Sequence, residues 1–296
     1  MAALAVPVVT GLALSGCTST AVAPEARESP PDYSASWPAG AELALTFEDT
    51  AGPGSVVPDT SNRGSAATSI TVSTRAGGRL VAAVGLDGVA VRFPGVRLDR
   101  PEASQAALLV RPVLAPGDPD PFAPADHDFV FGADILLDAA SEGASDNGDN
   151  VVQRGLYVDD SQFKLQIDHR RPSCRFAGSE GAVVVRADTI AVPGDWYRLA
   201  CSRTGTELAL VMSRWSGGAW SETGRWTEQG DVGALDFAAA KGTEVAPVSV
   251  GAKADARGDI PRSSGDQFNG AIDNVYVDVM VPEAVRAGGR IEEDVR

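Results

Sequence analysis

The chain of 296 residues carries 40 Asp and Glu against 25 Lys and Arg, which gives a formal net charge of −15. A charge of this sign argues against nonspecific binding to nucleic acid or to anionic lipid, because both need a positive field. It remains compatible with cations and with neutral ligands such as sugars. The length suits one large β-sandwich or two small domains.

The first residues resemble an export signal. Residues 2–16 form an apolar run that is too short to span a bilayer and is similar to the hydrophobic region of a signal peptide. The run ends in Leu14-Ser15-Gly16-Cys17, which resembles the lipobox of bacterial lipoproteins, where the Cys receives a lipid. No Lys or Arg precedes the run, which departs from that pattern and puts the start codon in doubt.

We therefore expect a lipoprotein signal peptide over residues 1–16 and a lipid on Cys17, with no other contact with the membrane. The protein would lie outside the cytoplasm, at the outer face of a bacterial cell membrane. A chance Cys in an ordinary signal peptide, and hence a secreted protein, is the alternative. Residues 17–40 are rich in Ser, Ala and Pro without an apolar period, so they predict a flexible tether.

From residue 41 onward, short runs with alternating apolar residues, separated by turn formers, predict strands. The runs are 41–47, 69–73, 80–84, 89–93, 106–111, 128–137, 151–159, 162–168, 174–176, 182–187, 196–203, 207–214, 248–252 and 271–280. The only helical signal is one short turn at 234–241, and 215–231 fits either a hairpin or a loop. The even spacing predicts an all-β jelly-roll sandwich over 41–283, with a polar tail over 284–296.

The last of these runs has the clearest alternation, and Gly270 before it suggests a tight entry. Strict period two places two sets of side chains on opposite faces. One set is Ile272, Asn274, Tyr276, Asp278 and Met280, and the other is Ala271, Asp273, Val275, Val277 and Val279.

The sequence from Phe268 to Val277, Phe-Asn-Gly-Ala-Ile-Asp-Asn-Val-Tyr-Val, resembles the closing strand of laminin G-like domains. Trp196–Cys201 with Glu207–Met212, and the segment Gly88–Gly95, are similar to other strands of that family. The likeness covers about residues 42–281. It implies a concanavalin A-like jelly-roll β-sandwich of two antiparallel sheets, and a module that binds a glycan or a cell-surface partner.

The glucanase relatives of that fold cleave glycosides with two carboxylates on one strand, and retaining hydrolysis needs them about 5 Å apart. Here Asp134 has no acidic residue two positions away, and Asp273 has only Asp278 on its strand. We therefore expect no catalytic residue and a binding role. A glycoside hydrolase of the same fold, or a structural envelope protein without a ligand, are the alternatives.

Laminin G-like domains often carry one calcium ion, which takes oxygen ligands from carboxylates and carbonyls. Asp49 and Asp59 belong to the first long loop, and Asp273 lies in the last strand. If the first and last strands adjoin, these three carboxylates converge on one structural Ca²⁺. The alternative is that Asp49 and Asp59 only cap turns.

The three cysteines are Cys17, Cys174 and Cys201. The lipobox uses the first, so the count leaves Cys174 and Cys201 to form a disulfide in an oxidising compartment. Trp215, Trp220 and Trp226 could form a stacking platform for sugars, although their spacing does not require a shared face and core packing is the alternative.

Overall fold

The structure is a computed structural model that describes residues 40–48, 52–54, 61–86, 88–95, 104–139, 149–237, 245–261 and 266–280. The chain divides into two units, Met1–Pro31 and Asp32–Arg296, and every described residue belongs to the second. The expected signal peptide, the lipidated Cys17 and the expected tail therefore lie outside the described residues. No described segment forms a helix long and apolar enough to cross a membrane.

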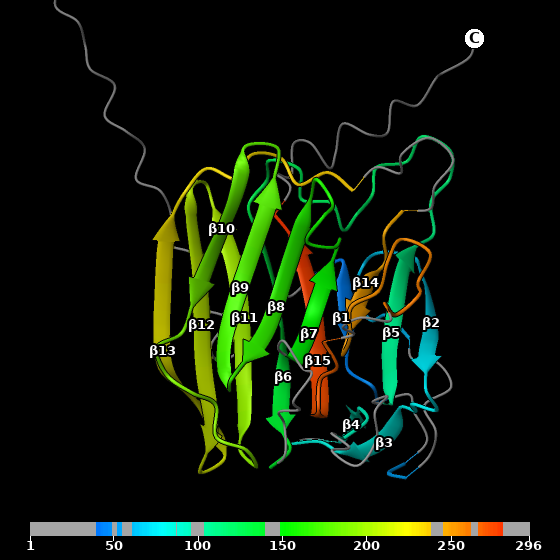
Figure 1. Ribbon diagram of the computed structural model, residues 1–296, viewed down its shortest axis with the longest axis vertical. Coiled ribbons are helices and arrows are strands. Elements are labelled where there is room, and N and C mark those ends of the chain that lie inside the picture. The colour runs from blue at the N-terminus through cyan, green and yellow to red at the C-terminus, as the bar shows by residue number, and fades with distance from the viewer. Residues whose placement is uncertain are drawn as a thin grey trace, which may run out of the picture. The chain divides into compact units, whose positions relative to one another are not determined.

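Seven strands form a sheet that faces the viewer in Figure 1 and is called the front sheet below. In chain order they are β2 (Thr68–Arg75), β5 (Gln105–Pro112), β7 (Asp149–Arg154), β8 (Gln162–Asp168), β9 (Arg171–Gly178), β10 (Gly181–Arg186) and β14 (Val248–Val250). Their order across the sheet is β10-β9-β8-β7-β14-β5-β2.

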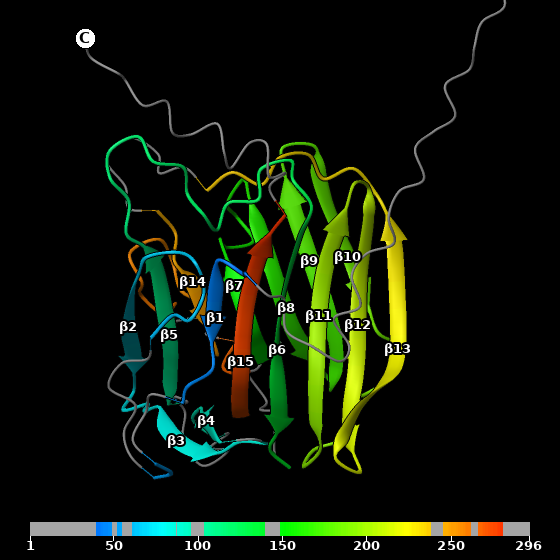
Figure 2. The same ribbon diagram turned by 180° about the vertical axis from the view of Figure 1, so that it is seen from behind.

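Eight strands form the back sheet, which faces the viewer in Figure 2. They are β1 (Leu43–Leu45), β3 (Val81–Val84), β4 (Val89–Arg92), β6 (Phe129–Leu137), β11 (Trp196–Thr204), β12 (Glu207–Ser216), β13 (Ala219–Gln229) and β15 (Gly270–Val279). Their order is β13-β12-β11-β6-β15-β4-β3, and β1 pairs with β15. All pairings in both sheets are antiparallel, which confirms the all-β sandwich.

The core lies between the two sheets because each strand turns its alternate apolar side chains inward. Its centre is aromatic. Phe131 of β6 and Phe163 of β8 come from opposite sheets, and their ring centroids are 4.7 Å apart. Phe129 and Phe176 pack around the same point, each 5.7 to 5.8 Å from a ring of this group. This packing fixes how the sheets face one another, and so which side chains remain on their outer faces.

Strict alternation in the last strand was a wrong expectation. The pairing of β15 with β6 shifts register between Asp273 and Tyr276, and Asn274 adopts a left-handed backbone with φ 49°. This extra residue is a β-bulge. Ile272, Val275, Val277 and Val279 therefore all face the core, while Asp273 lies on the opposite side of the strand from Ile272.

Two ambiguities of the sequence are resolved. The first and last strands do adjoin, with Leu43 opposite Val277. The Trp-rich segment is a hairpin, in which Trp215 of β12 lies opposite Trp220 of β13. The short helical turn expected at 234–241 is absent from the described part, where Leu235 makes a β-bridge with Ala125.

Cys174 of β9 and Cys201 of β11 form a disulfide that joins the front sheet to the back sheet, with their Cα atoms 5.8 Å apart. Both residues are buried in the core. Disulfides persist in oxidising compartments and are rare in the cytosol, so the bond fits an extracytoplasmic protein.

The double variant Cys174→Ala, Cys201→Ala should unfold at lower denaturant concentration. The bond closes a loop with a sequence separation of 27, which in the chain-entropy model stabilises the fold by about 3.5 kcal/mol. Urea titrations of the oxidised protein and the variant measure the difference. Two titratable thiols in the denatured, unreduced protein would show that the bond does not form.

Candidate functional site

A row of polar side chains crosses the outer face of the back sheet. Successive cross-strand partners from β15 to β13 bring these residues side by side, because directly opposite positions share a face of the sheet. The row consists of Asp273, Asp134, Arg198, Ser213 and Glu222. The sheet thus brings together five side chains, one from each of five strands, and none of them belongs to the hydrophobic core.

The centre of the row is an ion pair between Arg198 and Asp134. Arg198 donates from Nε to Oδ1 of Asp134 at 2.9 Å and from Nη2 to Oδ2 at 3.0 Å. The amide of Asn274, which the bulge brings to this face, donates to Oδ2 of Asp134 at 3.0 Å. Only 1% of Asp134 and 5% of Arg198 are exposed. This bidentate geometry orients both groups rigidly.

Two tryptophans border the ion pair. The guanidinium carbon of Arg198 lies 4.5 Å from the ring centroid of Trp220, a cation–π contact. Trp220 in turn meets Trp215 edge to face, with centroids 5.2 Å apart and the planes at 67°. Both rings are partly exposed, so the pair presents aromatic surface beside a charged group.

These groups line a hollow of about 570 Å³ on the outer face. Its lining comes from the back sheet and from the turns beside β1 and β4. The residues are Thr46, Glu48, Leu86, Gly88, Asp134, Arg198, Trp215, Trp220 and Asn274. The volume falls within the range of small-ligand sites, and aromatic walls with a few convergent polar groups are typical of such sites.

Asp273 lies opposite Asp134, a lining residue of this hollow, and is only 2% exposed. The pKa of its carboxyl is raised to about 8, chiefly by burial and next by the negative charge of Asp134, while the backbone N–H of Asn274 opposes the rise. Burial also raises the pKa of Asp134, but Arg198 and Asn274 oppose that effect. Since only Asp134 has the bidentate arginine, we assign the negative charge to Asp134 and the proton to Asp273.

The turn between β3 and β4 packs closely over these carboxyls. A Cβ added at Gly85 would lie 2.9 Å from Oδ2 of Asp273. Gly88 has φ +102°, and a Cβ there would collide with the carboxylate of Glu48, whose Oε1 accepts the N–H of Val89 at 3.1 Å. Glycine at both positions therefore allows the turn to approach the acidic groups.

The structure adds a pairing that a search along single strands does not find. Asp134 and Asp273 lie opposite one another on neighbouring strands. Asp49 and Asp59, the other two candidates for calcium ligands, lie outside the described residues. Among the residues that are described, no group of three or more His, Cys, Asp or Glu side chains is placed to hold a metal ion.

The three tryptophans of the hairpin divide between two environments. Trp215 and Trp220 line the hollow, as a stacking platform requires. Trp226 instead packs against the core and donates from its indole nitrogen to Asp188 at 2.9 Å. The β12–β13 register shift at Met212/Ser213 separates the two environments along β13.

No family model matches the sequence, and no curated protein matches it significantly. Solved structures with a similar fold include the binding domain of Paraclostridial Mosquitocidal Protein 1 (10% identity, TM-score 0.49, covering 84% of this chain and 51% of that one). The botulinum neurotoxin serotype G binding domain has 7% identity and TM-score 0.46, covering 83% and 50%. This chain thus spans about half the length of both.

A third similar structure is domain 4 of AbnA, a GH43 extracellular arabinanase from Geobacillus stearothermophilus, in complex with arabinotriose. It has 13% identity and TM-score 0.46, covering 84% of this chain and 98% of that chain. At these identities no residue role is transferred to this protein, and the site is argued from its own geometry.

Asp273→Asn should flatten the dependence of stability on pH. The folded pKa of about 8 lies above the ordinary value of 3.8, so between these values the folded state holds a proton that the unfolded state releases. The free energy of unfolding therefore falls as pH rises through this window, by at most about 1.4 kcal/mol per pH unit. Urea titrations from pH 4 to 9, in about 1 mM chelator, measure the slope.

Asp160→Asn, which changes an exposed carboxyl of the β7–β8 turn, is the matched control and should keep the slope of the unmodified protein. An equally steep slope in Asp273→Asn would show that the buried proton lies elsewhere.

Proposed function

We propose that this domain is a non-catalytic extracytoplasmic module that binds carbohydrate in the hollow on the back sheet. The observation that carries the proposal is the Trp215–Trp220 pair beside the Asp134–Arg198 ion pair. A sugar ring has an apolar C–H face and an edge of hydroxyl groups. The first suits an indole ring, and the second suits polar side chains of the lining such as Thr46 and Glu48, which can form hydrogen bonds with hydroxyl groups.

The glycan would belong to a cell surface or envelope, and the proposal includes attachment of the protein to the outer face of the membrane by a lipid on Cys17. The lipobox-like sequence Leu14-Ser15-Gly16-Cys17 supports the attachment. The disulfide between Cys174 and Cys201 supports export.

The cross-strand pair of Asp134 and Asp273 is a reason to consider glycoside hydrolysis, but its environment favours binding. A nucleophilic carboxylate must reach the sugar, and a general acid must reach the leaving oxygen. Asp134 has its oxygens occupied by Arg198 and Asn274, and Asp273 does not line the hollow. Oligosaccharides recovered after incubation should therefore be intact, with no new reducing ends.

Trp220→Ala should weaken binding of neutral oligosaccharides at least about tenfold, because it removes both a stacking surface and the aromatic support of Arg198. Isothermal titration of the full chain against gluco-, xylo-, galacto- and arabino-oligosaccharides measures the effect. Trp226→Phe changes the tryptophan of the same strand that packs against the core, and should bind as the unmodified protein does. Failure of the unmodified protein to bind any neutral oligosaccharide at millimolar concentration would contradict the proposal.

One structural calcium ion completes the proposal. Asp273 supplies a buried carboxyl close to Asp134 and Glu48, and calcium takes carboxylate and carbonyl oxygens. Because no group of three or more such side chains among the described residues is placed to hold a metal ion, Asp49 and Asp59 would have to supply further ligands. The ion would take the place of the proton that is assigned to Asp273.

Removal of calcium by chelator should lower the melting temperature. A ligand that binds only the folded state at a hundredfold excess over Kd stabilises it by about 2.7 kcal/mol. Thermal melts at pH 7, with calcium or with chelator, measure the difference, and Asp273→Ala should abolish it. Identical melting curves of the unmodified protein in both buffers would contradict the calcium site while leaving the sugar site untested by this experiment.

A further inference from the structure

A cluster of cationic side chains lies on the outer face of the front sheet. Lys164 of β8 and Arg175 of β9 are directly opposite one another. Lys164 Nζ is 3.0 Å from Oδ2 of Asp266, and Lys253 Nζ is 3.3 Å from Oδ1 of the same carboxylate. Two ammonium groups thus share one carboxylate, and the guanidinium of Arg175 lies on the neighbouring strand, in a chain whose net charge is −15.

The cationic groups of the cluster influence one another electrostatically. The pKa of Lys164 is lowered, and burial is the largest cause of this shift. The negative charge of Asp266 opposes the shift, whereas the positive charges of Lys253 and Arg175 add to it. Burial also lowers the pKa of Arg175. An anion placed against Arg175 and Lys164 would counter these effects, because an opposite charge nearby favours the charged form of each group.

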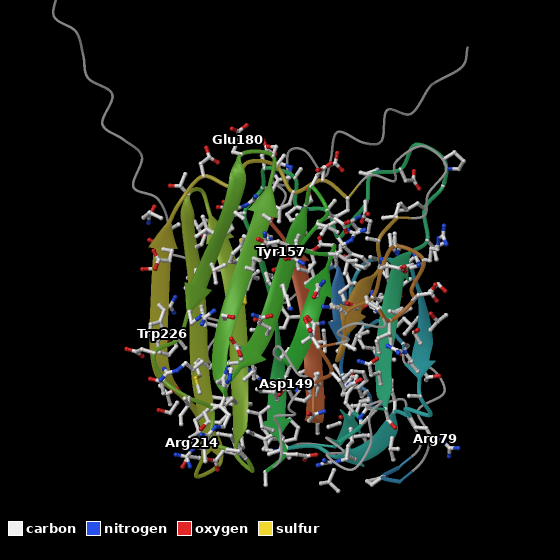
Figure 3. All side chains as sticks on the ribbon, in the orientation of Figure 1. Arg79, Asp149, Tyr157, Glu180, Arg214 and Trp226 are labelled. Carbon is white, nitrogen blue, oxygen red and sulfur yellow. A yellow bond between two sulfur atoms is a disulfide. The ribbon has the colours of Figure 1, made fainter. Side chains whose placement is uncertain are left out.

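Arg175 brings this charge to the surface together with an aromatic ring. Its guanidinium donates to Oε1 of Gln162 at 2.9 Å and lies 4.7 Å from the ring centroid of Tyr157. Tyr157 is 77% exposed, and Figure 3 shows it in front of the sheet near β8 and β9. The stacked ring fixes the guanidinium and leaves a second aromatic face in solvent.

A buried acceptor adjoins the cluster. Gln153 of β7 is the next cross-strand partner of Lys164 and is 1% exposed. Its Nε2 donates to the carbonyl of Gly155 at 2.5 Å, but its Oε1 has no hydrogen-bond partner among the described residues. A buried acceptor of this kind is satisfied by a donor such as a hydroxyl group.

From these contacts we infer that the outer face of the front sheet binds an acidic glycan, with a sugar carboxylate on Arg175 and the two lysines and a sugar ring against Tyr157. This site is separate from the hollow on the back sheet and does not depend on it. Asp159 and Asp160, both exposed in the adjoining turn, disfavour densely sulfated chains and favour isolated carboxylates. The ligand class is therefore a uronate-bearing oligosaccharide.

The test compares tri-galacturonate with its methyl ester, which removes the charge and keeps the sugar. Isothermal titration of the full chain should show binding of the acid alone, with affinity that falls as salt is raised from about 50 to 500 mM. Arg175→Gln should weaken binding at least about tenfold, since hydrogen bonds to charged groups are the strong ones. A heparin-derived oligosaccharide of equal length should bind more weakly than the uronate.

Matched controls separate this site from general charge and from the hollow. Arg79→Gln removes the same charge at an exposed arginine that Figure 3 places far from Tyr157, and should bind normally. Tyr157→Ala should weaken binding, whereas Val158→Ala, its exposed neighbour in the turn, should not. Trp220→Ala should leave acidic-glycan binding unchanged. Equal affinity for the acid and the ester, or equal loss in Arg79→Gln and Arg175→Gln, overturns the inference.

Discussion

The bulge at Asn274 is the constraint on which the back sheet depends. Because a strand turns successive side chains to opposite faces, one added residue exchanges the faces of everything that follows it. Here the exchange keeps both Ile272 and the three valines after the bulge in the core. It also leaves Asp273 opposite Asp134 and turns the amide of Asn274 toward the same carboxylate. The position that preserves the core therefore also builds the polar site.

An ion pair that is buried as deeply as Asp134 and Arg198 gives little net stability, since desolvation offsets most of the attraction. Breaking such a pair is costly, however, because it leaves one charge buried and alone. The pair thus holds its partners in one geometry more than it stabilises the fold. Trp220 over the guanidinium and Asn274 on the carboxylate restrict it further, which is what a preformed binding surface requires.

Several features followed from local sequence. Alternating runs and turn formers predicted the strands, and the cysteine count predicted the Cys174–Cys201 disulfide. The expected calcium site depends on the first and last strands being adjacent, and this condition is met. The site was harder to predict, because its members meet only through strand pairing. Asp134 and Asp273 belong to strands far apart in the chain, and their alignment depends on the register on both sides of the bulge. A search for carboxylates on one strand could not find them.

The tryptophans show the same limit on a smaller scale. Trp220 and Trp226 lie an even number of positions apart, so strict alternation along β13 would place both rings on the same face of the sheet. It gives no reason for Trp220 to face the hollow while Trp226 packs against the core. The irregular register of the hairpin supplies that reason. A sequence pattern describes one strand at a time, whereas a bulge depends on how two strands pair and on the turn between them. An asparagine in a strand is a usable signal, since Asn tolerates the left-handed backbone better than most residues.

The two outer faces of the sandwich differ in charge for a physical reason. On the back sheet, one arginine neutralises one aspartate and a proton neutralises the other, so the hollow offers fixed dipoles beside aromatic surface. On the front sheet, Asp266 forms ion pairs with both Lys164 and Lys253, and Arg175 lies directly opposite Lys164 on the next strand. An acidic ligand at the hollow would meet the carboxylate of Glu48, while a neutral ligand at the front face would gain nothing from the positive charge there. The ligands proposed for the two faces are therefore distinguished by their charge, because each face disfavours the ligand proposed for the other.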